Sequence, residues 1–406
     1  FYYVIMRAGL RPATTRFTMI QWQFMKKGAN SFFGQLVTIY FLSRLMLLLI
    51  GLLAMFYFPS ARSLFPIADL QYHRRQPNVL EMWTRWDSEW YLLIAEKGYR
   101  SYESFKDFGH GKYLPQDATK FFPAYPIGIR LLTYVTRSSV LSGWILSNVA
   151  ALAFLFYFYS LTSNLIDKEA AFGASLFYIF FPTSFFFNAV YSESLFLAAL
   201  LAGFYYIEKK NLFAGCAAIA LAILTRPQGL LALPALLWLV IRAFPQKKAL
   251  AGIAMLLAAI IPFAGYLIFL NTTFGSSQWF ALSQNYWRGE SRYPLYALVR
   301  FFQSDIAIHG QHNSIIDFSF AMFHLLILAL SFRMITAPYW IYSLLILLVP
   351  LSSSLFSFSR LGLVNFPLFI YLGGKITGRW SFALQTLFAM LLTFFMAAFA
   401  NWFWVG

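Results

Sequence analysis

Residues 34–58 read G-Q-L-V-T-I-Y-F-L-S-R-L-M-L-L-L-I-G-L-L-A-M-F-Y-F, with Arg44 as the one charged residue. A helix needs roughly 20 apolar residues to cross the hydrocarbon core of a bilayer, so this run predicts a membrane span. The whole chain of 406 residues is 60% hydrophobic and only 11% charged, a composition that is hard to reconcile with a soluble protein. We therefore predict an all-α polytopic membrane protein.

Further apolar runs follow one another to the end of the sequence. With the first run they predict about eleven spans, near 34–58, 138–161, 169–187, 190–207, 211–225, 228–244, 249–270, 314–333, 337–357, 361–375 and 381–402. Residues 121–136 are also apolar, but Pro123 and Pro126 stand at their start and Arg130 in their middle. Because this segment is also short, we interpret it as an interfacial helix on the membrane surface.

The basic residues predict an orientation. A net charge of +16 would suggest nucleic acid in a soluble protein, but here the lysines and arginines stand in short segments between apolar runs. This pattern indicates membrane topology and contact with anionic lipids, with no nucleic-acid partner. If residues 121–136 do not span, the positive-inside rule is satisfied by Arg7, Arg11, Arg16, Lys26, Lys27, Lys168, Lys209, Lys210, Arg242, Lys247, Lys248, Arg333, Lys375 and Arg379.

This topology divides the chain into a basic cytoplasmic lead-in, residues 1–33, and a single transmembrane domain, residues 34–406. Two large loops, 59–136 and 271–313, fall on the outer face. The single cysteine, Cys216, lies in an apolar run and excludes both an internal disulfide and a cysteine metal cluster.

The first outer loop contains the stretch W-T-R-W-D-S-E-W-Y-L-L-I-A-E-K-G-Y, residues 83–99. Asp87 stands where a helix can begin, and Gly98 is a natural helix end. In one interpretation Asp87 only caps an interfacial helix. In the other, the start of the helix holds this carboxylate at the membrane surface as a general base for a hydroxyl nucleophile. Both can hold at once.

Five further motifs follow this stretch in order. They are F-F-P-A-Y-P-I-G-I-R from residue 121, F-F-F-N-A-V-Y-S-E-S-L-F at 185–196, T-R-P-Q-G at 225–229, Q-N-Y-W at 284–287 and S-F-S-R-L-G-L-V-N-F-P-L-F at 357–369. Together with the loop, they resemble the GPI-anchor second mannosyltransferase and its prokaryotic relatives in the GT-C glycosyltransferase superfamily. The resemblance extends over most of the chain from about residue 36.

The resemblance implies a GT-C type fold in which Asp87 is the catalytic base. It also implies that mannose moves from polyprenyl-phosphate mannose to a lipid-linked or membrane-proximal glycan, with inversion at the sugar carbon. One departure is Trp90, where eukaryotic members often have histidine. This favours a prokaryotic relative with a different acceptor, acting at the periplasmic or extracellular face of a plasma membrane, with the lumenal face of the endoplasmic reticulum as the alternative.

Such a donor needs cationic groups for its departing phosphate, and guanidinium groups bind phosphate oxygens bidentately. The arginines of the outer face are Arg226, Arg288, Arg292 and Arg360, of which Arg360 is preferred because it lies within the last motif. Glu193 either caps a helix or contacts a sugar hydroxyl, and Glu89 either orients the acceptor or pairs with Arg85. The remaining expected substrate-binding residues are Trp86, Trp90, Gln284 and Trp287.

Three other functions are a metal-binding protein, a transporter and a transferase of another sugar. A metal site of His309 and His312 with Asp305 and Asp317 lacks a strong ligand framework, so we expect no metal and no other cofactor. A transporter would need a series of charges at mid-depth, which Arg44 and His324 do not form. A transferase of another lipid-phosphate sugar, such as arabinose or glucose, stays open, as does the need for a partner subunit.

Overall fold

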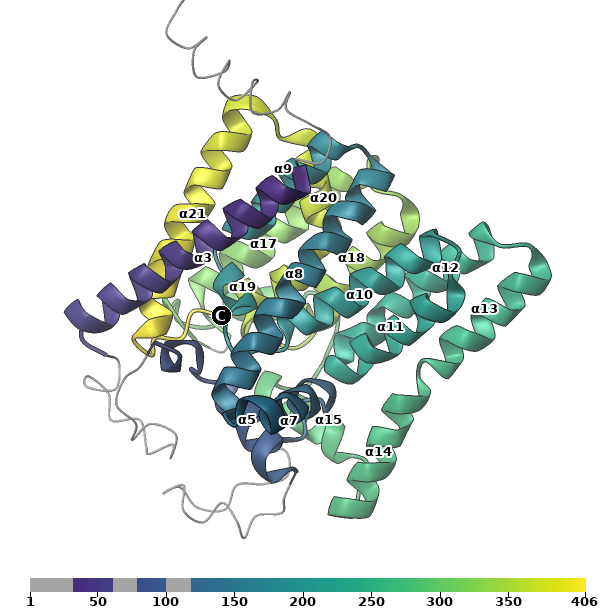
Figure 1. The fold of residues 1–406 in the computed structure, drawn as a ribbon, viewed down its shortest axis with the longest axis horizontal. Helices are drawn as coiled ribbons and strands as arrows, with labels where there is room; N and C mark the ends of the chain where they lie inside the picture. The colour runs from purple at the N-terminus through teal and green to yellow at the C-terminus, as the bar shows by residue number, and fades with distance from the viewer. Residues whose placement is uncertain (1–31, 61–78, 100–117, 311) are drawn as a thin grey trace, which may run out of the picture.

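The computed structural model describes residues 32–60, 79–99, 118–310 and 312–406. Most of the predicted lead-in, residues 1–33, therefore lies outside the described residues. Within the described ranges the chain is built of helices (Figure 1), and the one isolated β-bridge joins Ala307 and Ser314.

Every predicted apolar segment contains a helix, which confirms the positions of these segments. The helices are α3 (Phe32–Tyr57), α8 (Ser139–Leu165), α9 (Lys168–Phe180), α10 (Glu193–Glu208), α11 (Leu212–Thr225), α12 (Leu233–Ala243), α13 (Gln246–Ala258), α14 (Ile261–Phe274), α17 (Ile315–Ser331), α18 (Ala337–Leu351), α20 (Phe366–Lys375) and α21 (Gly378–Ala400). Four runs in the described ranges are long and apolar enough to cross a membrane, namely α3, α8, α13 with α14, and α21. The count of about eleven spans stays a prediction.

Helix α10 is buried along most of its length, and small residues there let backbones approach. Helix α10 lies between α8 and α11 (Figure 1). A Cβ atom on Gly215 of α11 would lie 3.2 Å from the Gly203 carbonyl oxygen of α10 and 2.6 Å from Cγ1 of Ile207. Glycine is therefore required at this contact, as is common between helices in membranes.

Short helices gather at one end of the bundle, at the bottom of Figure 1. They include α5 (Ser88–Lys97), α7 (Ala124–Thr136) and α15 (Trp279–Arg288). A helix of 13 residues is only about 20 Å long, too short to cross a bilayer core. Helix α7 also exposes an apolar face of Ile127, Leu131, Tyr134 and Val135. We therefore keep the interpretation of α7 as an interfacial helix.

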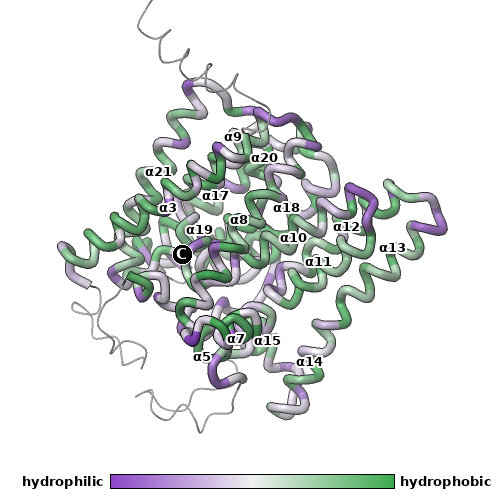
Figure 2. Tube along the Cα trace, in the orientation of Figure 1, coloured by the Kyte–Doolittle hydropathy of each residue, from purple (hydrophilic) through white to green (hydrophobic). Residues whose placement is uncertain are grey.

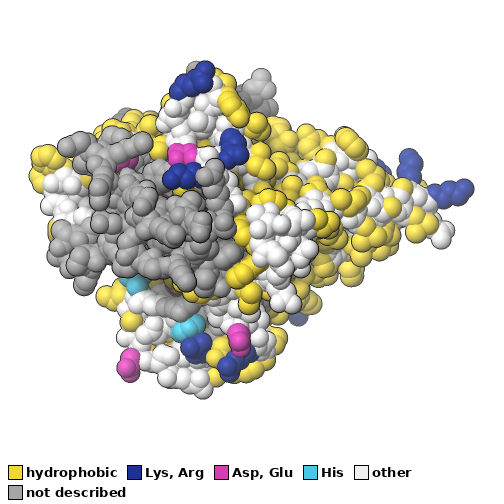
Figure 3. Space-filling model, turned by 90° about the horizontal axis from the view of Figure 1, so that it is seen from below, with side chains coloured by type: hydrophobic (Ala, Val, Ile, Leu, Met, Phe, Trp, Pro, Cys, Tyr) yellow, Lys and Arg dark blue, Asp and Glu magenta, His cyan; other side chains and the backbone are white. Residues whose placement is uncertain are grey.

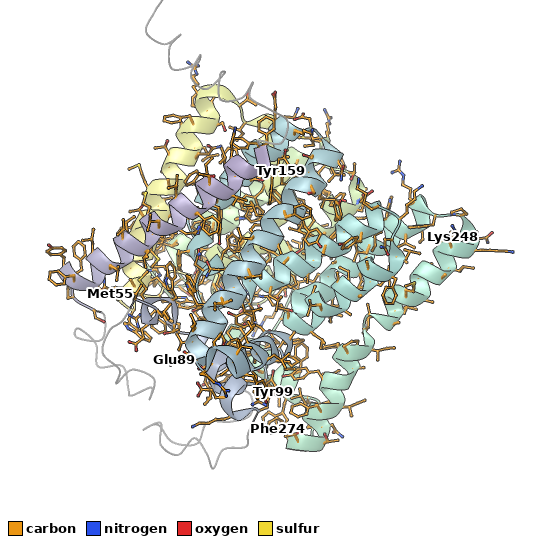
Figure 4. The ribbon with its side chains drawn as sticks, viewed as in Figure 1. Met55, Glu89, Tyr99, Tyr159, Lys248 and Phe274 are labelled. Atoms are coloured by element: carbon orange, nitrogen blue, oxygen red, sulfur yellow. The ribbon has the colours of Figure 1, made fainter. Side chains whose placement is uncertain are left out.

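The two ends of the bundle differ in the labelled residues that lie there, and polar residues lie mainly at the ends of the helices. Hydrophobic residues follow the helices and hydrophilic ones concentrate at their ends (Figure 2). Glu89, Tyr99 and Phe274 lie at the lower end, whereas Lys248 lies far from it at the start of α13 (Figure 4). Seen from below, charged and histidine side chains appear on the lower face, while hydrophobic side chains cover the flank (Figure 3).

The two ionisable residues considered for a transport pathway are held by the fold. The buried Arg44 guanidinium donates to the carbonyl oxygens of Ile179 (2.7 Å) and Ser184 (3.0 Å) and to Oδ1 of Asn188 (3.1 Å). Nδ1 of the buried His324 lies 2.7 Å from a carbonyl oxygen one turn earlier in its own helix. Both side chains thus satisfy local backbone and amide groups, which does not favour a charge pathway through the bundle.

Candidate active site

The turn before α5 determines where Asp87 points. Helix α5 begins directly after Asp87 and ends at Gly98 (φ 79°), as the sequence predicted. Among the described residues, the Asp87 side chain makes no hydrogen bond to the first turn of this helix. Trp86 adopts a left-handed conformation (φ 57°), which is strained for a bulky residue. Asp87 thus occupies the cap position without acting as a hydrogen-bonding cap, and its carboxylate lines a cleft.

In this cleft the Asp87 carboxylate contacts two cationic side chains. Nη1 of Arg360 donates to Oδ2 at 2.8 Å, although the two residues are 273 positions apart in the sequence. Nζ of Lys120 lies 3.7 Å from Oδ1. Burial alone would raise the pKa of Asp87, but the positive charges of Lys120, Arg360 and Arg226 together lower it below its usual value. The carboxylate is therefore ionised at neutral pH.

A second carboxylate lies beneath the cleft and holds two arginines. Glu193 is the first residue of α10 and its side chain is fully buried. Its Oε1 lies 2.5 Å from Nη1 of Arg226 and 2.9 Å from Nε of Arg360. Arg360 therefore bridges Glu193 and Asp87. Because the Glu193 carboxylate is absent from the cleft lining, the geometry favours a role in orienting these guanidinium groups over contact with a sugar hydroxyl.

Aromatic rings complete the surroundings of Arg360. Its guanidinium carbon lies 5.4 Å from the ring centre of Phe186, 5.2 Å from that of Tyr191 and 5.7 Å from that of Trp404. Such contacts attract a cation while excluding water from it. Trp404 also stacks on Phe356, so the segment after α21 packs beneath the last motif.

The backbone around Arg360 is tied to two other parts of the chain. Ser357, with φ 61°, begins the short helix α19 (Phe358–Leu361). The Ser359 N–H donates to Oδ1 of Asp317 in α17 at 2.8 Å, and the Thr183 hydroxyl donates to the Ser359 carbonyl oxygen at 3.0 Å. These bonds fix the turn that presents Arg360. Asp317, which the sequence suggested only as a metal ligand, takes part in this turn.

Helix α15 supplies the opposite wall of the cleft through Gln284, Trp287 and Arg288. Arg288 donates to the carbonyl oxygens of Phe356 (2.7 Å) and Ser354 (2.9 Å), which joins α15 to the segment before α19. Burial lowers the pKa of Arg288 to about 10, so it stays cationic at neutral pH. Lys120, Arg226, Arg288 and Arg360 outnumber the two carboxylates, Asp87 and Glu193, by two charges, which favours an anionic ligand.

The cleft is continuous with a less polar groove. The cleft spans about 650 Å³, part of which is open to solvent, and is lined by Asp87, Tyr91, Lys120, Phe121, Thr225, Arg226, Pro227, Gln228, Gln284, Trp287, Arg288, Phe356, Ser357, Arg360 and Leu361. The groove has about 740 Å³ and shares five of these residues, Pro227, Gln228, Gln284, Arg288 and Leu361. Beyond them it is lined by the apolar residues Leu231, Phe280, Val349 and Pro350 and by Asn285, Gly289, Ser291 and Ser353. A ligand with a charged head and an apolar tail fits this combination.

Several residues expected at the site lie outside this lining. Nε of Arg85 donates to the Ala400 carbonyl oxygen at 3.2 Å, and Trp86 packs on the rings of Trp402 and Trp404. Trp90 stacks on Phe121 with ring centres 5.8 Å apart, and Glu89 is buried. Arg292 stands over the ring of Tyr296. These contacts support the walls of the cleft and stay outside the cleft itself.

Among the residues that the sequence did not predict for the substrate site are two polar residues of the lining and one that supports it. Lys120 and Gln228 line the cleft, and Asp317 holds the turn of Arg360. Lys120 directly precedes the motif F-F-P-A-Y-P, and Gln228 belongs to T-R-P-Q-G, so both carried a sequence signal. The attention to arginines as phosphate ligands explains why the lysine was missed. For Asp317 the signal is absent, because its partner in α19 is 42 residues away.

Comparison with known proteins gives three findings. The family model described as mannosyltransferase (PIG-V) matches residues 35–292. The GPI alpha-1,6-mannosyltransferase 2 of Cricetulus griseus is 28% identical over 214 residues, which are 47% of this chain and 40% of that protein. A crystal structure of the Archaeoglobus fulgidus oligosaccharyltransferase in the apo form aligns over 90% of this chain and 56% of that one, with a TM-score of 0.42 and 13% identity.

Proposed function

The chain belongs to the PIG-V family of mannosyltransferases, and from this we propose that its cleft transfers mannose from a polyprenyl-phosphate donor to a membrane-bound glycan. Membership of this family confirms the resemblance seen in the sequence motifs. The chain matches under half the length of its curated relative, so the donor and the acceptor are our proposals. They rest on the chemistry of the cleft.

The contact between Asp87 and Arg360 carries the proposal. It brings the carboxylate of the first outer loop to 2.8 Å from the arginine of the last motif. A transfer from a sugar phosphate needs a base near the attacking hydroxyl and a cation near the departing phosphate. We assign the first role to Asp87 and the second to Arg360 with Arg226, both of which Glu193 orients.

The groove beside the cleft supports a lipid-linked donor. Its apolar wall of Leu231, Phe280, Val349 and Pro350 begins where Arg288 and Gln284 end the polar cleft. A polyprenyl chain placed there would bury apolar surface while its phosphate reaches the arginines. Because the chain comes from the apolar bilayer, the groove keeps it in apolar surroundings instead of exposing it to water. A water-soluble nucleotide sugar would leave the groove unused.

The proposed reaction is a single displacement. The acceptor oxygen attacks the anomeric carbon of the mannosyl phosphate, and the bond between that carbon and the phosphate oxygen breaks. The electron pair leaves with polyprenyl phosphate, whose charge Arg360 and Arg226 stabilise. The hydroxyl proton passes to Asp87. One displacement on a β-linked donor gives an α-mannoside, so no covalent enzyme intermediate and no second carboxylate acting as nucleophile are needed.

Replacing Asp87 tests the assignment of the base. We expect Asp87→Asn to reduce transfer from labelled polyprenyl-phosphate mannose to a glycolipid panel by about 10²–10⁴-fold, because general-base catalysis contributes that much. Binding of polyprenyl phosphate should persist, since the cations remain. Asp305→Asn, at an exposed residue outside the cleft, is the matched control. Full turnover by Asp87→Asn would exclude Asp87 as the base.

The same assay separates the related activities. Polyprenyl-phosphate arabinose and glucose are offered beside the mannose donor, and linkage analysis of the product identifies the acceptor hydroxyl. Transfer of mannose alone supports the proposed donor. Preferred transfer of another sugar would keep the lipid-phosphate chemistry and replace the sugar assignment.

A further inference from the structure

Lys120 occupies a place that its role as a simple partner of Asp87 does not explain. Its Nζ lies 3.7 Å from Oδ1 of Asp87, 3.5 Å from the ring centre of Trp287 and 4.6 Å from that of Phe121. At 3.7 Å the ammonium group forms an ion pair with Asp87 without a hydrogen bond, and aromatic faces replace only part of its hydration. Burial lowers the pKa of Lys120 to about 8, against the opposing effect of Asp87. Lys120 is thus a partly dehydrated cation on the wall of the cleft.

The charges around Asp87 also present a chemical conflict. A base must take a proton from a hydroxyl group, yet the cations around Asp87 lower its pKa. A lowered pKa makes the carboxylate a weaker proton acceptor. The groups that face Asp87 from the surrounding elements are Lys120, Arg360, Arg226, Tyr91, Tyr191 and, through Arg360, Glu193. Arg360 and Arg226 are both held by Glu193, whereas the one ion pair of Lys120 within the described residues is that with Asp87, so Lys120 can leave Asp87 without breaking a second ion pair among them.

We propose that Lys120 is a further donor-binding residue, which leaves Asp87 for the phosphate of the lipid-phosphate sugar and so frees Asp87 to accept the acceptor's proton. This inference rests on the proposed function, because it assumes a phosphate in the cleft. It predicts that the donor must bind before Asp87 becomes an effective base. The exchange needs only a rotation of a lysine side chain, whose flexible stem allows it.

Direct binding of farnesyl phosphate, a short polyprenyl monophosphate, tests the proposal on the full-length protein in detergent. Lys120→Met should weaken binding by about 10- to 100-fold, as expected for one charge-assisted contact, and Lys120→Arg should restore most of it. Lys97→Met, which removes an exposed lysine of α5 outside the cleft, should bind as the unmodified protein does. Unchanged binding by Lys120→Met would overturn the proposal.

The pH dependence of transfer gives a second readout. In the unmodified protein, the acid limb of kcat/KM for the acceptor at saturating donor should lie about 1–3 pH units above that of kcat/KM for the donor, because the donor removes a cation from Asp87. In Lys120→Met this gap should narrow, since Asp87 has already lost that cation. An equal gap in both proteins would show that Lys120 stays on Asp87.

These results also separate two kinds of failure. If the unmodified protein binds no farnesyl phosphate, the proposed lipid-phosphate donor is wrong, and the role of Lys120 falls with it. If the unmodified protein binds and transfers while Lys120→Met matches it in both measurements, the proposed function stands and only the role of Lys120 is wrong. Lys120→Arg shows whether a loss comes from the charge or from damage to the fold.

Discussion

At the scale of single residues, the site depends on a buried anion that orders cations. Glu193 is fully buried and contacts Arg226 at 2.5 Å and Arg360 at 2.9 Å. Without it, two guanidinium groups would repel each other in a region of low dielectric. Removing one member of a buried ion pair destabilises the fold by more than the intact pair stabilises it, because the remaining charge is left buried and unpaired. Glu193 therefore determines where both arginines point.

Replacing Glu193 by glutamine tests this role with almost no change in shape. We expect Glu193→Gln to lower the free energy of unfolding by roughly 3–5 kcal/mol and to weaken binding of farnesyl phosphate, since Arg226 and Arg360 lose their common anchor. Thermal unfolding and direct binding in detergent measure the two effects. Glu169→Gln, at an exposed position of α9, is the control. If Glu193→Gln matched the control in both thermal unfolding and binding, the ion pairs of Glu193 would contribute neither to stability nor to ligand binding.

The pairing of these residues shows how far sequence reasoning reaches at this scale. Asp87 and Arg360 were predictable because each lies in a motif of the family and on the expected face. That they touch was not predictable, because the contact joins positions 273 residues apart. The contact of Asp317 was unpredictable for the same reason, since its partner Ser359 is 42 residues away, whereas Lys120 stands beside a motif that the preference for arginine as a phosphate ligand left aside. Tertiary packing assigns their partners.

At the scale of elements, the short helix α20 shows where counting apolar residues is insufficient. The apolar run 361–375 predicts one span, but the structure divides it into α19 (Phe358–Leu361), a 3-10 turn at Gly362–Val364 and α20 (Phe366–Lys375). Pro367 in the first turn of α20 cannot donate a backbone hydrogen bond, so it favours a new helix start there. Hydropathy locates the apolar segments well, because buried segments must be apolar. It does not detect the interruption of the helix that places Arg360 in a turn.

Close packing of α20 on α9 keeps the Arg360 turn in place. Substitution of Gly373, which lies in this contact, tests the packing. A Cβ atom on Gly373 would lie 2.5 Å from the Ala170 carbonyl oxygen, and backbone atoms there cannot move aside. We expect Gly373→Ala to lower the free energy of unfolding by about 1–3 kcal/mol through overpacking. Gly265→Ala in α14, where no described atom lies within 4 Å, should be neutral or slightly stabilising. Equal melting temperatures would contradict the close contact.

At the scale of the whole molecule, the polarity of the two ends organises the protein. Helices α5, α7 and α15 lie at one end (Figure 1), and α5 and α15 contribute residues to the lining of the cleft. Lys248 lies far from that end (Figure 4), as the positive-inside rule requires if the cleft faces outward. We propose that the cleft faces the periplasm or the cell exterior, because an acceptor glycan and a lipid donor can both reach it from the membrane surface.

Cysteine labelling can test this orientation, because Cys216 is the single cysteine of the chain and is buried. In a Cys216→Ser background, Lys97→Cys stands near the cleft and Lys248→Cys near the opposite end, both at exposed positions. A membrane-impermeant maleimide applied to intact cells should label Lys97→Cys at once and Lys248→Cys only after permeabilisation. This outcome is expected because, under the positive-inside rule, the positive charges near Lys248 would keep that end in the cytoplasm. The reverse pattern would place the cleft inside the cell, where the proposed outward-facing acceptor could not reach it.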